Sequence, residues 1–441
     1  MGKETFYMKS ARNLNRLWKS YDAAIWIRAI GTALTSITNF MMRPFLVLYL
    51  YGQLEGNVFL SMLVVSLSPF MGMLVGLFAG KLSDRVGRKP VMLTSLLIQC
   101  ASMLGFMAAT SVWHYALISV FSGVGHALFY PAANAQVSDV VPEDKRPEVF
   151  ALFHTALNLG AAAGPLLGLL LFNWNMHLVF FACAVTTGIY ALLVWWKVPE
   201  TLQAAPQASV SAAGELSSSA AVESGPFSLS GWFKKHKLLV SITLSSMPVT
   251  LLYALVESAF PLHLQSRFTN YQSIFASLMT FNGLMVILLQ IWIARKTANM
   301  ALHRVMGTAY IMFALVALGY GFAPWIVLLF VVEFVFTIGE MMNGPHSQKL
   351  VSVIAPAEER GFYFSFYSMN WQVSRFLGPL LAGLVLSKLN GEWLFGMLAV
   401  LIAAGGVSMF FVCRTYYRRT VSSAAEASRT CEAVAAAEAS A

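Results

Sequence analysis

The stretch "GKLSDRVGRKP", Gly80 to Pro90, places five charged residues among eleven. In the 441-residue chain as a whole, only 11% of residues are charged and 58% are hydrophobic, and long apolar runs flank this stretch. A mean hydropathy of +0.66 with so few charges is typical of a chain surrounded by lipid. We therefore predict an all-α integral membrane protein in which Gly80–Pro90 is a loop between two spans.

The apolar runs are long enough for helices that cross a hydrocarbon core of about 30 Å, and none alternates as a β-barrel strand would. The four cysteines show no paired spacing, so we expect neither a disulfide nor a metal site, and no cofactor. We predict twelve transmembrane helices, at 24–50, 56–80, 90–110, 113–138, 148–171, 177–197, 238–264, 271–294, 303–322, 325–351, 362–387 and 393–413.

Lysine and arginine divide the predicted loops into two sets. The set that contains the opening stretch carries nearly all of them, and on the opposite side lie only Arg267 and Lys388. Because short loops rich in Lys and Arg stay in the cytoplasm, we predict that both termini are cytoplasmic. The same asymmetry accounts for the net charge of +9, so we expect no nucleic-acid partner.

A segment rich in Ala, Ser and Pro separates two sets of six predicted spans and is typical of a flexible linker. A shift of 214 residues carries "PAANAQVSDVVPEDKR" onto "PHSQKLVSVIAPAEER" in register, which indicates an internal duplication. The predicted parts are a cytoplasmic N-terminus (1–23), an N-terminal six-helix bundle (24–197), a cytoplasmic linker (198–237), a C-terminal six-helix bundle (238–413) and a disordered cytoplasmic tail (414–441).

The opening stretch follows the pattern G-x-L-x-D-R-x-G-R-K/R-x and so resembles the loop between helices two and three of the major facilitator superfamily. The resemblance implies two pseudo-symmetric six-helix bundles that alternate access around a central site. Glycine permits close helix approach and tight turns, and Asp84 can form charge-assisted bonds with nearby arginines. We predict a conformational gate; its residues are Gly80, Asp84, Arg85, Gly87, Arg88, Lys89 and Arg43. The alternative is that these charges only fix the topology.

A second motif lies in the predicted fifth span, "NLGAAAGPLLG", with Gly160, Gly164, Pro165 and Gly168. It resembles the g-x-x-x-G-P-x-x-G motif of the superfamily's antiporters. Small residues four apart form a groove for a neighbouring helix, and a proline offers a bend, so plain helix packing is the alternative. The resemblance covers essentially the whole chain and is closest to bacterial drug:proton antiporters. It implies a monomer in the bacterial inner membrane, driven by the proton motive force.

Charged side chains inside predicted spans are costly, so each suggests a function. We expect Glu257 and Glu340 to carry protons and to anchor cationic substrates. Glu333, seven residues before Glu340 and therefore on the same helix face, is a further predicted substrate-binding residue. The repeat places Arg43 over Glu257, so a permanent salt bridge between the two is the alternative for Glu257.

The resemblance also assigns proton coupling to Asp139, together with Asp84, although Asp139 could instead cap or pair locally. One departure from the family pattern is Ser119, where many members carry an arginine, so an arginine-based proton relay is not carried over. Trp371 and Tyr130 are predicted substrate contacts, and His126 is expected to be structural.

The sequence thus predicts a secondary transporter that exports amphipathic, often cationic compounds in exchange for protons, with the lipid bilayer, protons and lipophilic cations as partners. An enzyme is not expected, because the chain holds no HExxH, paired His/Asp or nucleophile motif. The alternatives are a proton-coupled symporter and an exporter of a specific metabolite, lipid or siderophore.

Overall fold

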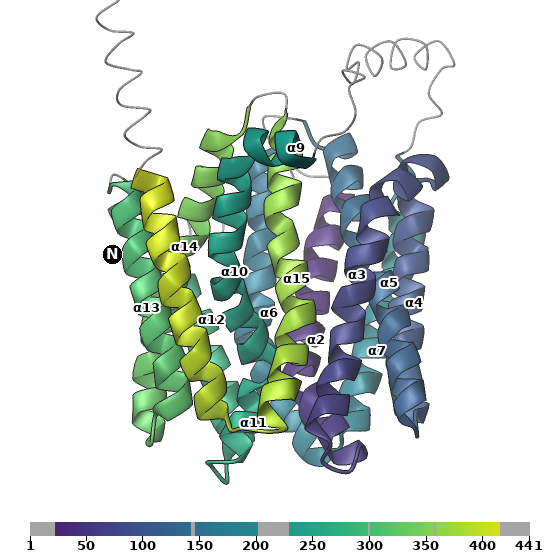
Figure 1. The fold of residues 1–441 in the computed structure, drawn as a ribbon. Helices are drawn as coiled ribbons and strands as arrows, with labels where there is room; N and C mark the ends of the chain where they lie inside the picture. Colours follow the sequence, from purple (N-terminus) through teal and green to yellow (C-terminus); the bar gives the residue numbers. More distant parts are fainter. Residues whose placement is uncertain (1–22, 143–145, 202–228, 299, 357–358, 415–441) are drawn as a thin grey trace, which may run out of the picture. The chain divides into compact units, whose positions relative to one another are not determined.

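The computed structural model describes residues 23–142, 146–201, 229–298, 300–356 and 359–414. Nearly all of the predicted N-terminus (1–23), most of the linker and nearly all of the tail therefore lie outside the described residues. Within them every regular element is a helix, which confirms the predicted all-α class (Figure 1). The elements are α2 (Ala23–Gln53), α3 (Val58–Val86), α4 (Arg88–Ala108), α5 (Val112–Val140), α6 (Arg146–Trp174), α7 (Met176–Lys197), α9 (Leu229–Lys235), α10 (Lys237–Ser258), α11 (Phe260–Gln265), α12 (Tyr271–Thr297), α13 (Leu302–Phe322), α14 (Ile326–Ile354), α15 (Arg360–Leu386) and a last helix, Gly391–Arg414.

Eleven helices of the described chain are long and apolar enough to cross a membrane. A twelfth long helix, α15, is not among them, because several polar side chains interrupt its apolar sequence. Two of these bond to α10: the Asn370 amide donates to the Ser246 hydroxyl at 2.7 Å, and Ser374 lies 2.7 Å from the Thr250 hydroxyl. Such pairing satisfies polar groups away from water, so α15 is compatible with the predicted eleventh span.

Polar loop residues fix where several helices begin. Asn57, Ser111 and Asn175 precede α3, α5 and α7, and the side chain of each accepts a hydrogen bond from a backbone N–H of the first turn. These caps satisfy donors that have no partner within the helix. The sequence placed these spans within a few residues, although α3 runs on to Val86 and so includes Asp84.

The predicted seventh span, 238–264, is not one continuous helix. It breaks at Ala259 into α10 and α11, because Pro261 has no N–H with which to bond the carbonyl of Glu257, four residues earlier. Glu257 therefore lies at the end of a helix, where the sequence had predicted the inside of an unbroken span.

The end of the predicted linker is helical. Residues Leu229–Lys235 form α9, and the Lys235 ammonium donates to Glu359, just before α15, at 2.6 Å. This hydrogen bond holds the pKa of Glu359 below its ordinary value. His236 follows α9 and is buried against the rings of Trp232 and Tyr363. These contacts fix α9 to the start of α15.

The chain forms two compact units. One contains residues 1–225 with Glu257–Ile287 and Pro379–Leu384, and the other contains Pro226–Val256, Leu288–Gly378 and the residues from Val385 onward. The unit boundaries thus group all of α11, and parts of α10, α12 and α15, with the first half of the chain. The division into bundles at 24–197 and 238–413 stays a prediction.

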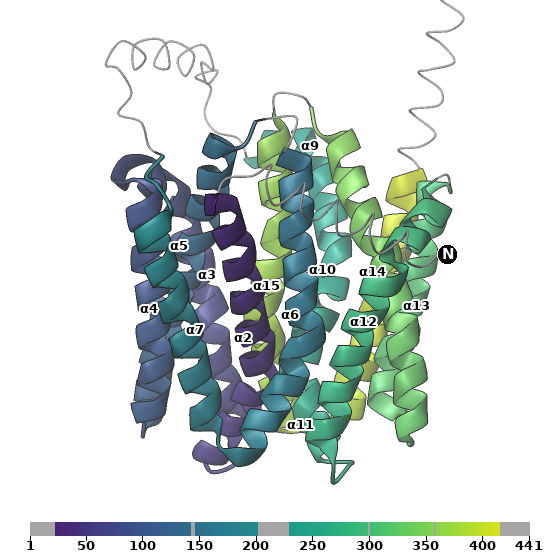
Figure 2. The same ribbon diagram turned by 180° about the vertical axis from the view of Figure 1, so that it is seen from behind.

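Glycines allow close helix packing within each unit. In the first unit, a Cβ on Gly123 of α5 would lie 2.2 Å from the Ser68 carbonyl oxygen of α3, and α2 and α6 run side by side (Figure 2). In the second unit, a Cβ on Gly319 of α13 would lie 2.3 Å from Val332 of α14. These contacts hold in place the helices that carry the candidate functional side chains.

Candidate functional site

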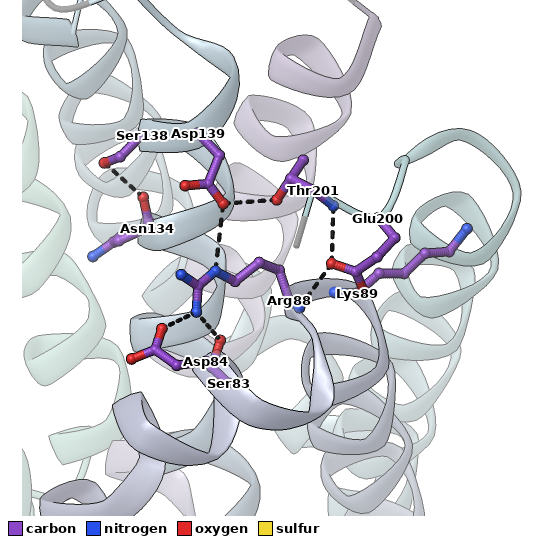
Figure 3. A network of polar contacts seen from close by, with 9 residues as sticks. All are labelled: Ser83, Asp84, Arg88, Lys89, Asn134, Ser138, Asp139, Glu200 and Thr201. Atoms are coloured by element: carbon purple, nitrogen blue, oxygen red, sulfur yellow. Dashed lines mark hydrogen bonds and ion pairs between the residues drawn. The ribbon is translucent and has the colours of Figure 1, made fainter. Parts of the chain in front are cut away.

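Arg88, the first residue of α4, lies between two carboxylates (Figure 3). Its guanidinium pairs with Asp84 at the end of α3 and donates to the Ser83 hydroxyl at 3.2 Å. On its other side, Nε lies 3.4 Å from Oδ2 of Asp139, near the end of α5. One arginine therefore connects the ends of α3 and α5 to the start of α4.

Asp139 has a second partner in the same place. The Thr201 hydroxyl, just beyond α7, donates to Asp139 Oδ2 at 2.8 Å. The local pairing that was the alternative for Asp139 is thus present, and its role in proton coupling stays a prediction.

Glu200 caps the start of α4, and sequence reasoning missed it. Its two carboxylate oxygens accept from the backbone N–H groups of Arg88 and Lys89, each at 3.0 Å. A carboxylate at a helix N-terminus satisfies free donors and complements the helix dipole. The one signal in the sequence was an isolated acidic residue, "VPET", after the last apolar run of the first half. We call Asp84, Arg88, Asp139, Glu200 and Thr201 the loop network.

Gly87 is required by this cap. Its φ of +114° lies outside the range that other residues adopt easily, and a Cβ there would lie 2.6 Å from Glu200 Oε2. The predicted tight turn at Gly87 therefore has two physical causes, the backbone conformation and the space that the capping carboxylate occupies.

Two other predictions for the gate differ from the structure. A Cβ on Gly80 would meet no described atom within 4 Å, so the close helix approach predicted there is not seen. Arg85 is exposed, and among the described residues Asp84 pairs with Arg88 and not with Arg85. The reason is geometric: the chain turns at Gly87, so that Arg88, at the start of α4, lies beside both Asp84 and Asp139.

The glycine motif of α6 packs directly on α2. A Cβ on Gly160, Gly164 or Gly168 would lie 2.2 Å from Ser36, 2.6 Å from Phe40 and 2.5 Å from the Met41 carbonyl oxygen, respectively. The motif, with Pro165 inside the helix, thus forms a continuous seam in which α2 occupies the groove. We call this contact the α2–α6 seam. Helix packing, the structural alternative, is what this geometry displays.

Arg43 of α2 and Glu257 of α10 form an ion pair within the first unit. Arg43 Nη1 lies 3.3 Å from Glu257 Oε2, and the two side chains are 36% and 29% exposed. The two residues are 214 positions apart, which is the shift of the internal repeat. The salt bridge that was the alternative role for Glu257 is therefore present, between residues that correspond in the two halves.

Glu340 of α14 lies beside an aromatic group in the second unit. It is half-buried and hydrogen-bonded to Tyr253 of α10. The Tyr253 ring packs against Trp371 and Phe336, with centroid separations of 5.1 and 5.0 Å. The structure thus brings Trp371, a predicted substrate contact, close to Glu340, and adds Tyr253, which sequence reasoning missed because nothing distinguishes it from other apolar-span tyrosines.

Glu333 is 0% exposed, and its Oε2 accepts a 2.6 Å hydrogen bond from the Tyr320 hydroxyl of α13. A carboxylate without accessible surface offers no contact to a drug-sized molecule. The burial of Glu333 does not favour the predicted contact with substrate, which stays a prediction; seven residues further along α14, Glu340 is only half-buried.

Other candidates lie in the first unit. Tyr130 is 47% exposed on α5, and its ring contacts Phe129. His126 lines a cavity of about 20 Å³ together with Thr35, Gln99 and Thr187. A space of this size and polarity suits one water molecule, which agrees with a structural histidine.

Arg28 is a buried charge that sequence reasoning passed over. It is 4% exposed, donates to the Tyr190 hydroxyl at 3.3 Å and to Asn134 Oδ1 at 3.4 Å, and lies against the ring of Phe129. The sequence did contain a signal for this buried charge, because Arg28 lies a few residues inside the first predicted span.

The comparisons with known proteins agree with these features. The family model described as Major Facilitator Superfamily matches residues 28–274 and 238–437. An uncharacterized MFS-type transporter of Bacillus subtilis, YhjO, is 33% identical, with 89% of this chain and 93% of that protein covered. A multi-drug resistance efflux pump PmrA homolog of Lactococcus lactis is 24% identical, with 90% and 93% covered.

Among solved structures, a POT family transporter in complex with 5-aminolevulinic acid superposes with a TM-score of 0.73. It is 12% identical, and the match covers 90% of this chain and 97% of that chain. At this identity the similarity extends to the fold alone.

Proposed function

The chain belongs to the major facilitator superfamily, a family of multi-pass membrane transporters and not of enzymes, and we propose that it exports amphipathic, often cationic compounds in exchange for protons. In this proposal it works as a monomer in the bacterial inner membrane, with both termini in the cytoplasm. The two halves alternate access around the substrate.

The main support for an amphipathic cation as the substrate is the arrangement of Glu340, Tyr253 and Trp371. A half-buried carboxylate attracts a positive charge, and the faces of aromatic rings add cation–π attraction and apolar contact. An amphipathic cation matches both, whereas a neutral sugar or an anion does not. A carboxylate that can hold either a cation or a proton makes binding of the two compete, which is the requirement for exchange.

The α2–α6 seam and the multi-drug efflux pump among the relatives support export over uptake. The seam is formed by the glycine motif that resembles the one in antiporters. The Lactococcus lactis relative is named as an efflux pump, and at 24% identity its name is a guide to the substrate class and no more.

The loop network has the part of a gate in this proposal. Asp84 and Asp139 hold Arg88 from two sides, so protonation of either carboxylate weakens the junction of α3, α4 and α5. This would couple proton movement to the conformation of the first half.

The decisive experiment measures direction and coupling together. In inverted membrane vesicles that contain the protein, an imposed proton gradient, acidic inside, should drive accumulation of a fluorescent lipophilic cation. Vesicles with Glu340→Gln should accumulate no more dye than vesicles without the protein. Dye movement in the opposite direction would indicate a symporter and contradict export, and unaltered transport by Glu340→Gln would remove Glu340 from the mechanism.

A further inference from the structure

We propose that the proton of the exchange resides on Glu333, positioned by Tyr320, while Glu340 contacts the substrate. This inference rests on the proposed function, because it assigns separate tasks to the two carboxylates of α14. It replaces the expectation that both bind substrate.

The first argument is access. Glu333 is 0% exposed and Glu340 is half-buried. A substrate molecule needs surface to contact, whereas a proton needs no volume and travels along hydroxyl and carboxyl groups. The sealed carboxylate therefore suits the proton, and the partly accessible one suits the organic cation.

The second argument is the incomplete bonding of Glu333. Oε2 accepts from Tyr320, but Oε1 is buried and has no hydrogen-bond partner among the described residues. An ionised carboxylate in such a place lacks the donors and the counter-charge that stabilise it, whereas the protonated form carries no net charge. Protonation thus removes the free-energy cost of a buried negative charge that the surrounding side chains do not stabilise.

The third argument concerns the titratable groups around Glu333 and around its neighbour Tyr253. Because one group within electrostatic range of Glu333 is a second carboxylate, a like charge adds to the cost of the ionised form of Glu333. Tyr320 of α13 bonds to it, and Glu340 of the same helix and Tyr253 of α10 lie within electrostatic range. From α15, Tyr367 lies within range of Tyr253, and Arg375 lies 5.7 Å from the Trp371 ring that packs on Tyr253.

Tyr253 provides the route between the two carboxylates. It hydrogen-bonds Glu340 and lies within electrostatic range of Glu333. A proton passes when the Tyr253 oxygen accepts one from protonated Glu340 and releases its own toward ionised Glu333. The tyrosine is unchanged, one carboxyl loses a proton and the other gains it. An organic cation that binds to ionised Glu340 neutralises the like charge that favours the proton on Glu333. The proton then leaves Glu333, so that binding of the cation and of the proton alternate, as exchange requires.

The test uses the full-length protein in proteoliposomes and in detergent, with tetraphenylphosphonium as the probe. The variants are Glu333→Gln, Glu340→Gln and, as a matched carboxyl-to-amide control outside the pair, Glu392→Gln. Equilibrium binding of the probe, proton release into weak buffer and proton-driven accumulation are measured for each. Exchange of labelled for unlabelled probe without a gradient reports conformational cycling.

We expect Glu333→Gln to bind the probe within about twofold of wild type and to retain exchange, because the substrate site and cycling are intact. Proton-driven accumulation should be lost. Glu340→Gln should bind the probe at least about tenfold more weakly, and Glu392→Gln should match wild type.

Tyr320→Phe provides a second variant that keeps the fold and the volume. Tyr320 is a positioning residue, and its hydroxyl stabilises the ionised form of Glu333. Its loss should move the midpoint of the transport pH profile up by about one pH unit, the equivalent of one hydrogen bond. A merely structural role would lower transport without moving the midpoint. If Glu333→Gln fails to fold, the direction of this shift decides the question.

Two results would overturn the inference. The first is that folded Glu333→Gln accumulates the probe at the wild-type level when a proton gradient is imposed. The second is that Glu333→Gln loses as much probe binding as Glu340→Gln does. Failure of the proposed function looks different, because wild type itself would then show no proton-driven accumulation and no proton release on binding.

Discussion

At the scale of single residues, Arg43 and Glu257 show how a duplicated chain acquires a site. The repeat makes the two positions equivalent, yet one carries a cation and the other an anion, and they bond to each other at 3.3 Å. The break in the seventh span at Ala259 places Glu257 at a helix end, where its carboxylate can change partners when the helix end moves.

Charge substitution tests whether this pair is used in transport. Arg43→Glu and Glu257→Arg each place two like charges together, and each should reduce proton-driven transport about tenfold or more, the equivalent of about 1.4 kcal/mol. The double variant restores opposite charges and should recover much of the loss, which a double-mutant cycle on transport rates measures. If the double variant is as poor as the worse single one, the pair acts through something other than its mutual attraction.

The residue types at the loop network were predictable, but their partners were not. The motif at Gly80–Pro90 identified Asp84, Gly87 and Arg88, because the pattern of charges and glycines is local. Glu200 lies 112 residues after Arg88 and reaches it only because α7 ends beside the start of α4. The sequence around Arg88 gives no indication that Glu200 lies beside it. The same holds for Tyr320 and Glu333, which face each other because of the close packing of α13 on α14.

At the scale of helices, the α2–α6 seam is set by small residues and should respond to volume. Gly164→Ala gains about 0.5–1 kcal/mol of helix propensity but puts a Cβ 2.6 Å from Phe40 and 2.8 Å from the Ile37 carbonyl oxygen. Overpacking of this kind costs about 1–3 kcal/mol, so we expect a net loss of stability. Thermal unfolding in detergent should show a lower midpoint for Gly164→Ala.

Gly76→Ala on α3 is the matched control, because a Cβ there would meet no described atom within 4 Å. It should unfold at the wild-type temperature or slightly above. A Gly164→Ala protein as stable as Gly76→Ala would mean that the seam has room to spare and that the motif does not depend on close packing.

The helices themselves followed from the apolar runs, and the exceptions have identifiable causes. The break after Ser258 depends on Pro261, which the sequence displays but which other spans tolerate without a break, as α2 does at Pro44. α15 was placed correctly although its polar side chains lower its hydropathy, because α10 supplies partners for them. Whether a proline or a polar residue interrupts a span is decided by its neighbours, which a single sequence does not specify.

At the scale of the whole molecule, the direction of transport depends on which ends of the helices face the cytoplasm. The charge pattern predicts that the stretch Gly80–Pro90, with Lys81 near the end of α3, is inside and that the "YGQLEGN" segment around Glu55 is outside. Single-cysteine variants Glu55→Cys and Lys81→Cys, made in a chain whose four native cysteines are replaced by alanine, test this on intact cells. Both positions are exposed, so a reagent can reach either one from its own side of the membrane.

A membrane-impermeant maleimide should label Glu55→Cys on intact cells and Lys81→Cys only after the membrane is opened. The reason is electrostatic, because loops rich in Lys and Arg are retained on the cytoplasmic side during insertion. The reverse labelling pattern would mean that the protein lies in the membrane in the opposite orientation, with the loop network on the outer side. Proton-driven export would then require the opposite gradient, and the assignment of the loop network as a cytoplasmic gate would be wrong even if Glu333 and Glu340 kept their chemical roles.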